Sequence, residues 1–136
     1  MEKSFKLEII SPVKTVFNGE VSSVTIPGTM GSFQVLMNHA PLVSSFEIGM
    51  IKIEKGPEVM EYSTSGGIFE IKNNKAVILA QTIESKEEID LSRARNSKSR
   101  AEMILKMGDV RDDEKSEAKV SLQRANNRIK LAETKK

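Results

Sequence analysis

The first 85 residues alternate between short apolar runs and polar positions, and glycine, proline or asparagine separates the runs. Apolar side chains at every second position are typical of half-buried β-strands. Turn-forming residues recur roughly every 8–12 positions, which is the spacing of an antiparallel sandwich or barrel. We therefore expect an N-terminal antiparallel β-sandwich of about 8–10 strands. The expected strands include residues 5–9, 13–17, 24–26, 33–36, 51–54, 59–64, 69–71 and 77–80.

Glycine-containing pairs and loops mark the expected turns. Asn18-Gly19 predicts a hairpin turn, and Gly56-Pro57 and Asn73-Asn74 predict two more. The segments 27–31 and 65–67 contain two glycines each, but no helix follows either one and no lysine completes a phosphate-binding loop. We interpret both as tight turns. Met30 and Phe33 lie near the tip of the first, where exposed apolar side chains can mark a protein contact.

The pattern changes at Ser85, after which charged residues fill nearly every second position. Ser85-Lys86-Glu87-Glu88 has the S-x-x-E form of a capping box and predicts a helix start. Gly108 predicts its end, and Asp112 or Asp113 can cap a second helix. The two helices are expected to pair as an antiparallel hairpin. Their apolar stripes are Ile89, Ala94, Ala101, Ile104 and Leu105, then Ala118, Leu122, Ala125, Ile129 and Ala132.

The same position divides the composition. All four prolines and seven of the eight glycines precede residue 85. Residues 1–85 carry 7 basic and 9 acidic side chains, whereas residues 86–136 carry 14 basic and 10 acidic ones. We expect a β-sandwich domain over 1–85 and a helical arm over 86–136. Alanine-rich stripes bury little apolar area, so the two helices are held weakly and the arm could open. The alternative is a static hairpin docked on the sandwich.

Composition narrows the class of protein. The chain has no cysteine, so disulfides and thiolate metal sites are excluded. No apolar run approaches the roughly 18–20 residues of a membrane span, and the N-terminus lacks a signal-peptide core. We expect a soluble protein that reaches a membrane only indirectly, through a partner. A net charge of +2 with one tyrosine, five phenylalanines and no tryptophan disfavours the alternative, a nucleic-acid-binding β module with a basic helical tail.

Candidate chemistry is sparse. His39 is the one histidine, no nucleophile or acid is spaced to serve it, and no ligand cluster suggests a metal. We expect no catalytic residue, no metal and no enzyme activity of the chain alone. Arg93 and Arg100 on the first helix, and Arg124 and Arg128 on the second, could meet in a hairpin and bind a polyphosphate. The alternative is a solvated helix face.

Three motifs resemble a known family. Residues 28–43, GTMGSFQVLMNHAPLV, are similar to the signature loop and strand of the epsilon subunits of F-type ATP synthases. SGGIFEI at 65–71 resembles the second signature of these subunits, and IDLSRA at 89–94 resembles the start of their first C-terminal helix. The resemblance covers essentially the whole chain, in order. It implies the same fold, a β-sandwich followed by a helical hairpin.

The resemblance also implies a role in the central stalk. Such a subunit links the gamma subunit to the c-ring, couples ion transport to ATP synthesis and performs no chemistry. It lies at the cytoplasmic face of the bacterial inner membrane. Met30, Gly31, Ser32 and His39 match the ring- and gamma-contacting region, although many relatives carry an acidic residue where Ser32 stands. The extended arm contacts the alpha/beta head and inhibits ATP hydrolysis.

No cofactor is required in such a subunit, but some bacterial relatives bind ATP in the folded hairpin as a regulatory ligand. By resemblance, the matching positions here are Glu84, Asp90, Arg93, Arg100, Arg124 and Arg128.

Overall fold

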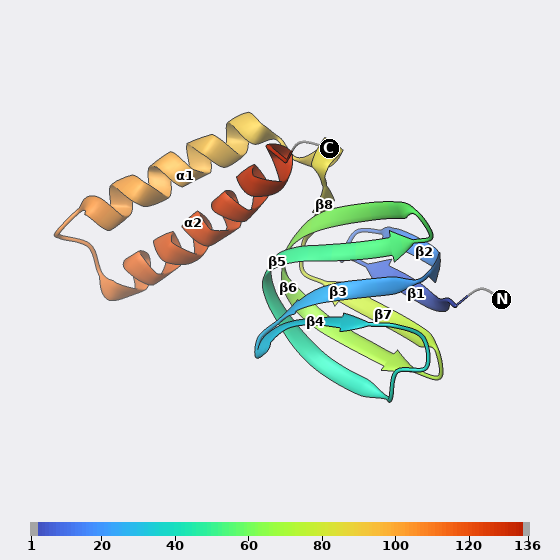
Figure 1. Cartoon of the computed structure of the whole chain (residues 1–136). Helices are drawn as coiled ribbons and strands as arrows, with labels where there is room; N and C mark the ends of the chain where they lie inside the picture. The colour runs from blue at the N-terminus through green and yellow to red at the C-terminus, as the bar shows by residue number, and fades with distance from the viewer. Residues whose placement is uncertain (1–2, 135–136) are drawn as a thin grey trace. The chain divides into compact units, whose positions relative to one another are not determined.

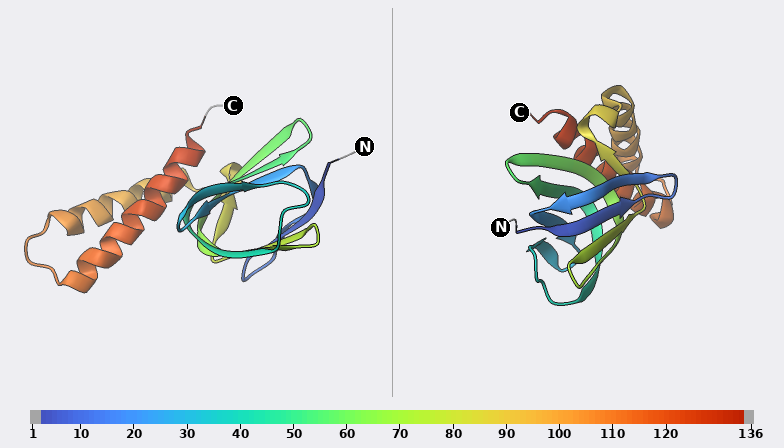
Figure 2. Two further views of the ribbon diagram at one scale, coloured as in Figure 1. Left: turned by 60° about the horizontal axis from the view of Figure 1, so that its bottom comes forward. Right: turned by 90° about the vertical axis from the view of Figure 1, so that its right-hand side faces the viewer.

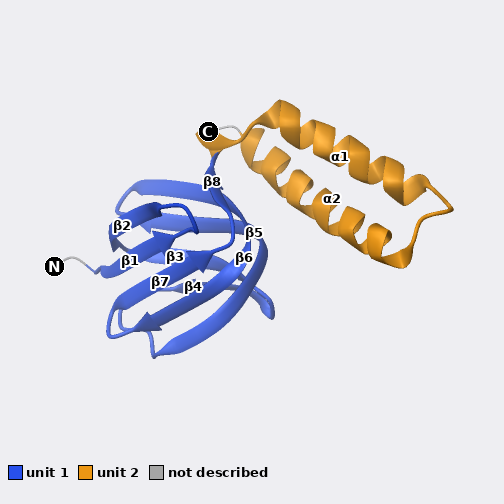
Figure 3. Ribbon diagram, turned by 180° about the vertical axis from the view of Figure 1, so that it is seen from behind, with its two compact units in different colours: residues 1–85 blue, residues 86–136 orange. Residues whose placement is uncertain are grey.

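The computed structural model describes residues 3–134, and the chain divides into two compact units, residues 1–85 and 86–136 (Figures 1 and 3). Within the described residues the first unit is built of strands and the second of helices. The strands are β1 (Phe5–Ile10), β2 (Thr15–Val21), β3 (Ser23–Gly28), β4 (Gly31–Val35), β5 (Leu42–Lys55), β6 (Glu58–Lys72), β7 (Lys75–Ala80) and β8 (Ile83–Ser85).

The strands form one continuous sheet in the order β2-β1-β7-β6-β5-β3-β4, and β8 pairs with β6. All neighbours are antiparallel except β1 and β7, which are parallel. The long strands β5 and β6 carry β3 and β4 at one end and β7 and β1 at the other, and the sheet curls over itself (Figure 2). The predicted β-sandwich is confirmed, and its two layers share two strands.

The alternation in the sequence matches the faces of the sheet. Phe5, Leu7 and Ile9 of β1 are at most 1% exposed, while the residues between them face outward. A similar alternation recurs in β3, in the second half of β6 and in β7, as expected for a sheet with one solvated face. The core is completed by Val21, Val24, Ile26, Val35, Phe46, Ile51, Ile53, Phe69, Ile71, Ala76, Ile78, Ala80 and Ile83.

One predicted turn is wrong because its residues continue a strand. Asn18 and Gly19 lie within β2, opposite Glu8 and Leu7 of β1. Neither residue has the positive φ that a tight Asn-Gly hairpin turn needs. The chain instead reverses before β2, where the Ser11 N–H donates to the Lys14 carbonyl at 2.9 Å.

A second predicted turn, at residues 65–67, is also wrong, because these residues lie inside β6. Gly66 has φ +125°, and a Cβ on Gly67 would overlap the carbonyl oxygen of Leu79. Gly66 therefore allows a bend in β6, and Gly67 allows the backbones of β6 and β7 to approach closely. Two strand segments are absent from the expected set: β8 and the first half of β5.

The other predicted turns are confirmed. Gly56-Pro57 joins β5 to β6 with Gly56 at φ +61°, and Asn73-Asn74 joins β6 to β7 with φ values of 53° and 59°. Positive φ at both central residues is the signature of a type I′ turn. Thr29-Met30 closes the β3–β4 hairpin, where Gly28 pairs with Gly31.

The helical unit is an antiparallel hairpin, as predicted (Figure 1). A short 3₁₀ helix, η1 (Lys86–Glu88), precedes α1 (Leu91–Lys106) and α2 (Asp112–Ala132). α1 ends two residues before Gly108, close to the expected position.

The helix start predicted at Ser85 coincides with η1, which begins directly after Ser85 at the end of β8, whereas α1 begins later and is capped by Asp90, which accepts the Arg93 N–H at 3.0 Å. The cap predicted for the second helix is wrong. Asp112 is the first residue of α2 and Arg111 its N-cap, where Glu114 accepts the Arg111 N–H at 3.3 Å.

We expect Gly67→Ala to destabilise the β unit by about 1–3 kcal/mol or more, because the added methyl overlaps the Leu79 carbonyl. Chemical denaturation monitored by circular dichroism measures this free energy. Gly19→Ala is the matched control, since its Cβ would meet only the Phe17 ring at 3.5 Å. Equal stability of the two variants would contradict the close approach.

Candidate functional site

The two helices of the arm contact each other mainly through alanine. Ala94 and Ala101 of α1 are buried, as are Ala118 and Ala125 of α2, and among the described residues of the arm the one large buried side chain is Leu131. A buried alanine removes much less apolar area from water than a leucine. The hairpin is therefore held by little hydrophobic burial.

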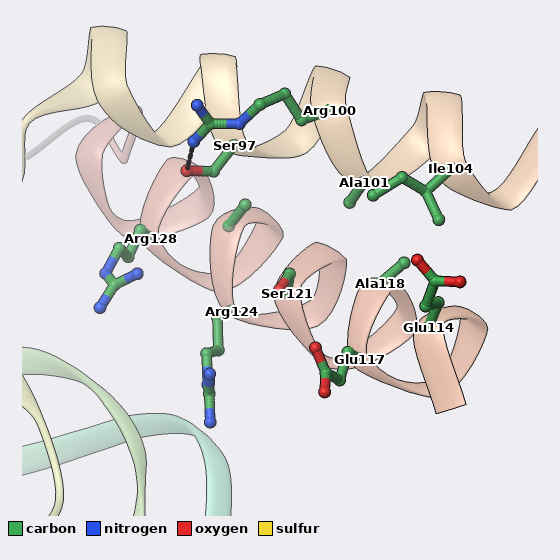
Figure 4. Close-up of a pocket in the computed structure, with 11 residues that line it drawn as sticks. Ser97, Arg100, Ala101, Ile104, Glu114, Glu117, Ala118, Ser121, Arg124 and Arg128 are labelled. Carbon is green, nitrogen blue, oxygen red and sulfur yellow. Dashed lines mark hydrogen bonds between the residues drawn. The ribbon is translucent and has the colours of Figure 1, made fainter. Parts of the chain in front are cut away.

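A groove of about 370 Å³ runs along the hairpin between α1 and α2 (Figure 4). Ala101, Ile104, Ala118 and Ala125 supply its apolar lining. Its polar residues are Ser97, Arg100, Glu114, Glu117, Ser121, Arg124 and Arg128.

Three of the six residues expected to bind ATP line this groove: Arg100, Arg124 and Arg128. The Arg100 side chain turns back along α1, where Nη2 donates to the Ser97 hydroxyl at 3.4 Å, and Arg124 and Arg128 project from α2 (Figure 4). The guanidinium groups thus share one groove without pointing at one another. Guanidinium forks suit phosphate oxygens, so this is the part of the arm best fitted to a polyphosphate.

The other three expected residues are not in the groove lining. Asp90 and Arg93 lie at the first turn of α1, where the Asp90 carboxylate already caps the helix. Glu84 lies on β8 in the β unit, where β8 pairs with β6. The sequence grouped these residues by resemblance, and the structure groups only the three arginines.

Polar contacts fasten the open end of the hairpin. Arg95 Nη2 and Glu133 Oε2 form an ion pair at 2.7 Å. The Lys86 ammonium donates to the Thr134 carbonyl at the end of α2, where a cation complements the helix dipole. Sequence reasoning missed both contacts because they join residues 38 and 48 positions apart.

The β3–β4 hairpin presents an apolar tip. Met30 is 99% exposed, Gly31 has φ +124°, and Ser32 is exposed beside it. Phe33 does not share this exposure, contrary to the expectation, because its ring packs edge-on against Phe69 at 5.9 Å between centroids. The protein contact suggested for this tip therefore depends on Met30.

His39 is exposed in the loop that follows the opposite end of β4. The Asn38 N–H donates to Asn74 Oδ1 at 2.6 Å and Asn74 Nδ2 donates to Asn38 Oδ1 at 3.1 Å, which ties this loop to the β6–β7 turn. Five residues of strand, at about 3.3 Å each, separate the Met30 tip from the His39 loop. The four residues assigned to one contact region therefore form two separate surfaces.

The outward face of the β unit carries exposed apolar side chains that the sequence analysis did not single out. Ile68 of β6 and Leu79 of β7 are 43% and 50% exposed and lie directly opposite each other. Ile10 of β1 lies beside Leu79 in the parallel register. We call Ile10, Leu79 and Ile68 the apolar row. Its signal in the sequence is an apolar residue at outward positions of three strands.

Residues 3–134 show neither a metal-binding cluster nor a membrane-spanning helix. In this part of the chain no three histidine or acidic side chains are placed to bind a metal ion. No helix there has both the length and the apolar character that crossing a bilayer requires.

The chain matches two family models that together span most of its length. The model described as "ATP synthase, Delta/Epsilon chain, beta-sandwich domain" matches residues 4–86. The model described as "ATP synthase, Delta/Epsilon chain, long alpha-helix domain" matches residues 87–133.

Curated relatives and solved structures agree with these matches. The ATP synthase epsilon chain of Desulforamulus reducens is 38% identical over 133 residues, covering 98% of this chain and 100% of the relative. That of Desulfitobacterium hafniense is 41% identical, covering 97% and 98%. A chain in the Euglena gracilis mitochondrial ATP synthase has the same fold, with a TM-score of 0.81, 18% identity, and coverage of 93% of this chain and 80% of that one.

We expect the arginine groove to bind inorganic tripolyphosphate, with an affinity that falls as salt rises. Replacing Arg100 and Arg124 together by alanine should abolish the heat measured by titration calorimetry, because two of the three guanidinium groups are lost. Lys119→Ala, which removes an exposed cation of α2 outside the groove, should leave binding unchanged. Equal loss in both variants would indicate general charge attraction instead of a groove.

Proposed function

The chain belongs to the family of ATP synthase delta/epsilon chains, and we propose that it is the epsilon subunit in the central stalk of a bacterial F-type ATP synthase. Its full-length similarity to epsilon chains, with both family domains present in order, supports this assignment. In this role the chain supplies binding surfaces and a regulatory arm, and other subunits carry out the chemistry. It is peripheral, on the cytoplasmic face of the membrane.

The stalk role rests on the full-length similarity to epsilon chains, and within that role the apolar row is the proposed docking surface for the gamma subunit. Two exposed apolar side chains, Ile68 and Leu79, beside the half-buried Ile10 form an apolar patch across three strands, a feature typical of protein contacts. Ile10, Leu79 and Ile68 also border a shallow hollow lined by Pro12 and Gly67, into which a partner side chain can insert. The Met30 tip, on a separate hairpin, is the proposed contact with the c-ring.

The arm is the proposed inhibitor of ATP hydrolysis and sensor of ATP. Its alanine contacts bury little area, so a ligand that binds only the folded hairpin can decide whether the hairpin opens. Such a ligand stabilises the folded state by about 2.7 kcal/mol at a hundredfold excess over Kd. ATP held by Arg100, Arg124 and Arg128 would act in this way. When ATP falls, the freed arm reaches the alpha/beta head and blocks hydrolysis.

We expect Ile68→Glu and Leu79→Glu each to weaken binding to the gamma subunit at least tenfold, because each places a charge in the apolar row. Surface plasmon resonance with immobilised gamma measures the loss. Val59→Glu, the same change at an exposed residue outside the row, should bind normally. Met30→Glu should keep gamma binding and lose association with the c-ring. Normal gamma binding by both row variants would refute the docking surface.

Two changes in the arm are expected to act in opposite directions on ATP hydrolysis by the reconstituted enzyme. Deleting residues 86–136 should raise the hydrolysis rate at every ATP concentration, since the inhibitory element is gone. Arg124→Ala with Arg128→Ala should lower the rate at millimolar ATP, because ATP no longer holds the hairpin folded. Identical rates for the arginine variant and the unmodified chain would count against ATP sensing.

A further inference from the structure

The outward face of β1, β7 and β6 sorts its side chains by type into three parallel rows. Strand register places Ile10 opposite Leu79 and Leu79 opposite Ile68, which forms the apolar row. Two residues further along the strands is an acidic row, and beyond that a basic row. The acidic row consists of two glutamates, Glu8 and Glu70, on either side of the half-buried Val77, and the basic row contains Lys6, Lys75 and Lys72.

The basic row gives the fold no evident advantage. Lys75 lies directly opposite Lys6 on one side and Lys72 on the other, at the ~4.8 Å spacing of neighbouring strands. Like charges directly opposite each other destabilise a sheet. All three side chains are exposed, and none of them forms an ion pair with another described residue. A row of this kind is best explained by a partner.

We infer that these rows dock a single protein segment of matching order, which presents apolar, then basic, then acidic groups at steps of about 6.6 Å. Steps of this length correspond to two residues of a strand or four to five residues of a helix. The segment runs along the strand direction from the Ile68 end of the face toward the β6–β7 turn. This inference rests on the proposed docking of gamma, and it adds the orientation and chemistry of the docked segment.

The row order favours a protein over an anionic membrane. Glu8 and Glu70 lie one row from the lysines, within the range of unscreened attraction and repulsion at physiological salt. A uniformly anionic lipid surface that approached the lysines would be repelled by these two carboxylates. A protein segment with alternating charge satisfies both rows, and complementary charges of this kind fix register and raise association rates.

The test measures binding of full-length chain to purified gamma subunit over a range of salt concentrations. We expect Lys75→Glu and Glu70→Lys each to weaken binding about three- to tenfold at low salt, mainly through the association rate. The double variant, which exchanges one charge between the acidic and basic rows without changing net charge, should bind more weakly than either single variant. Lys52→Glu and Glu61→Lys, which pair with each other in the other half of β5 and β6, are the matched controls and should bind normally.

The outcomes separate this inference from the proposed function. Suppose that Ile68→Glu abolishes binding while the charge reversals have no effect. Gamma then docks on the apolar row, but the order of the charged rows plays no part, and the inference fails. If the double variant regains normal affinity, net charge alone matters, and the inference fails again. A third outcome would show that the basic row binds a membrane and not a protein. In that outcome the chain sediments with phosphatidylglycerol vesicles, this binding requires Lys6, Lys72 and Lys75, and the affinity for gamma is unchanged in the charge-reversal variants.

Discussion

The β unit depends on a close approach between two backbones at Gly67. At this point β6 passes so near the Leu79 carbonyl that no side chain fits, and the preceding Gly66 has a positive φ. The bend there, with the matching course of β5, lets one continuous sheet fold over its own core. It also fixes the pairing of β6 with β7 that aligns the apolar, acidic and basic rows. The order of the three rows on the outward face therefore depends on the close approach at Gly67.

The two units differ in what holds them together. The β unit buries phenylalanine, isoleucine, leucine and valine from every layer of the sheet. The helical unit buries four alanines and one leucine, and adds an exposed ion pair between Arg95 and Glu133. Exposed ion pairs are worth only about 0–1 kcal/mol. The same chain thus combines a firmly packed sheet with a hairpin that buries little apolar area, which fits the proposed division into a docked part and a regulated part.

Much of the fold followed from the sequence because hydrophobic periodicity reflects burial directly. The alternation in Phe5–Ile9 and the asparagines at 73–74 were sufficient to predict a strand and a turn that the structure confirms. Gly66-Gly67 was misassigned because glycine signals both turns and close backbone approach, and only tertiary contacts distinguish them. Asn18-Gly19 was misassigned because the pairing of β2 with β1 continues through these residues.

The candidate sites were harder to predict than the fold. Resemblance named six ligand positions, but only knowledge of the helix faces groups Arg100, Arg124 and Arg128 along one groove. The apolar row could not be predicted from the sequence. Ile10 and Leu79 become neighbours only through the parallel pairing of β1 with β7, and Ile68 joins them through the pairing of β6 with β7. Its members look unremarkable one at a time, since single exposed apolar residues are common.

The sharing of β5 and β6 between both layers has a mechanical consequence. In most sandwiches, a load on one layer reaches the other through side-chain packing, which yields by sliding. Here the Met30 hairpin is joined to the face that bears the apolar row by unbroken strands and their hydrogen bonds, from β3 through β5 and β6 to β7. Torque applied at the Met30 hairpin would therefore pass along the strands themselves and through the backbone hydrogen bonds that join them. Such a hydrogen-bonded connection would suit the proposed role, in which the domain turns together with partners bound at its two surfaces.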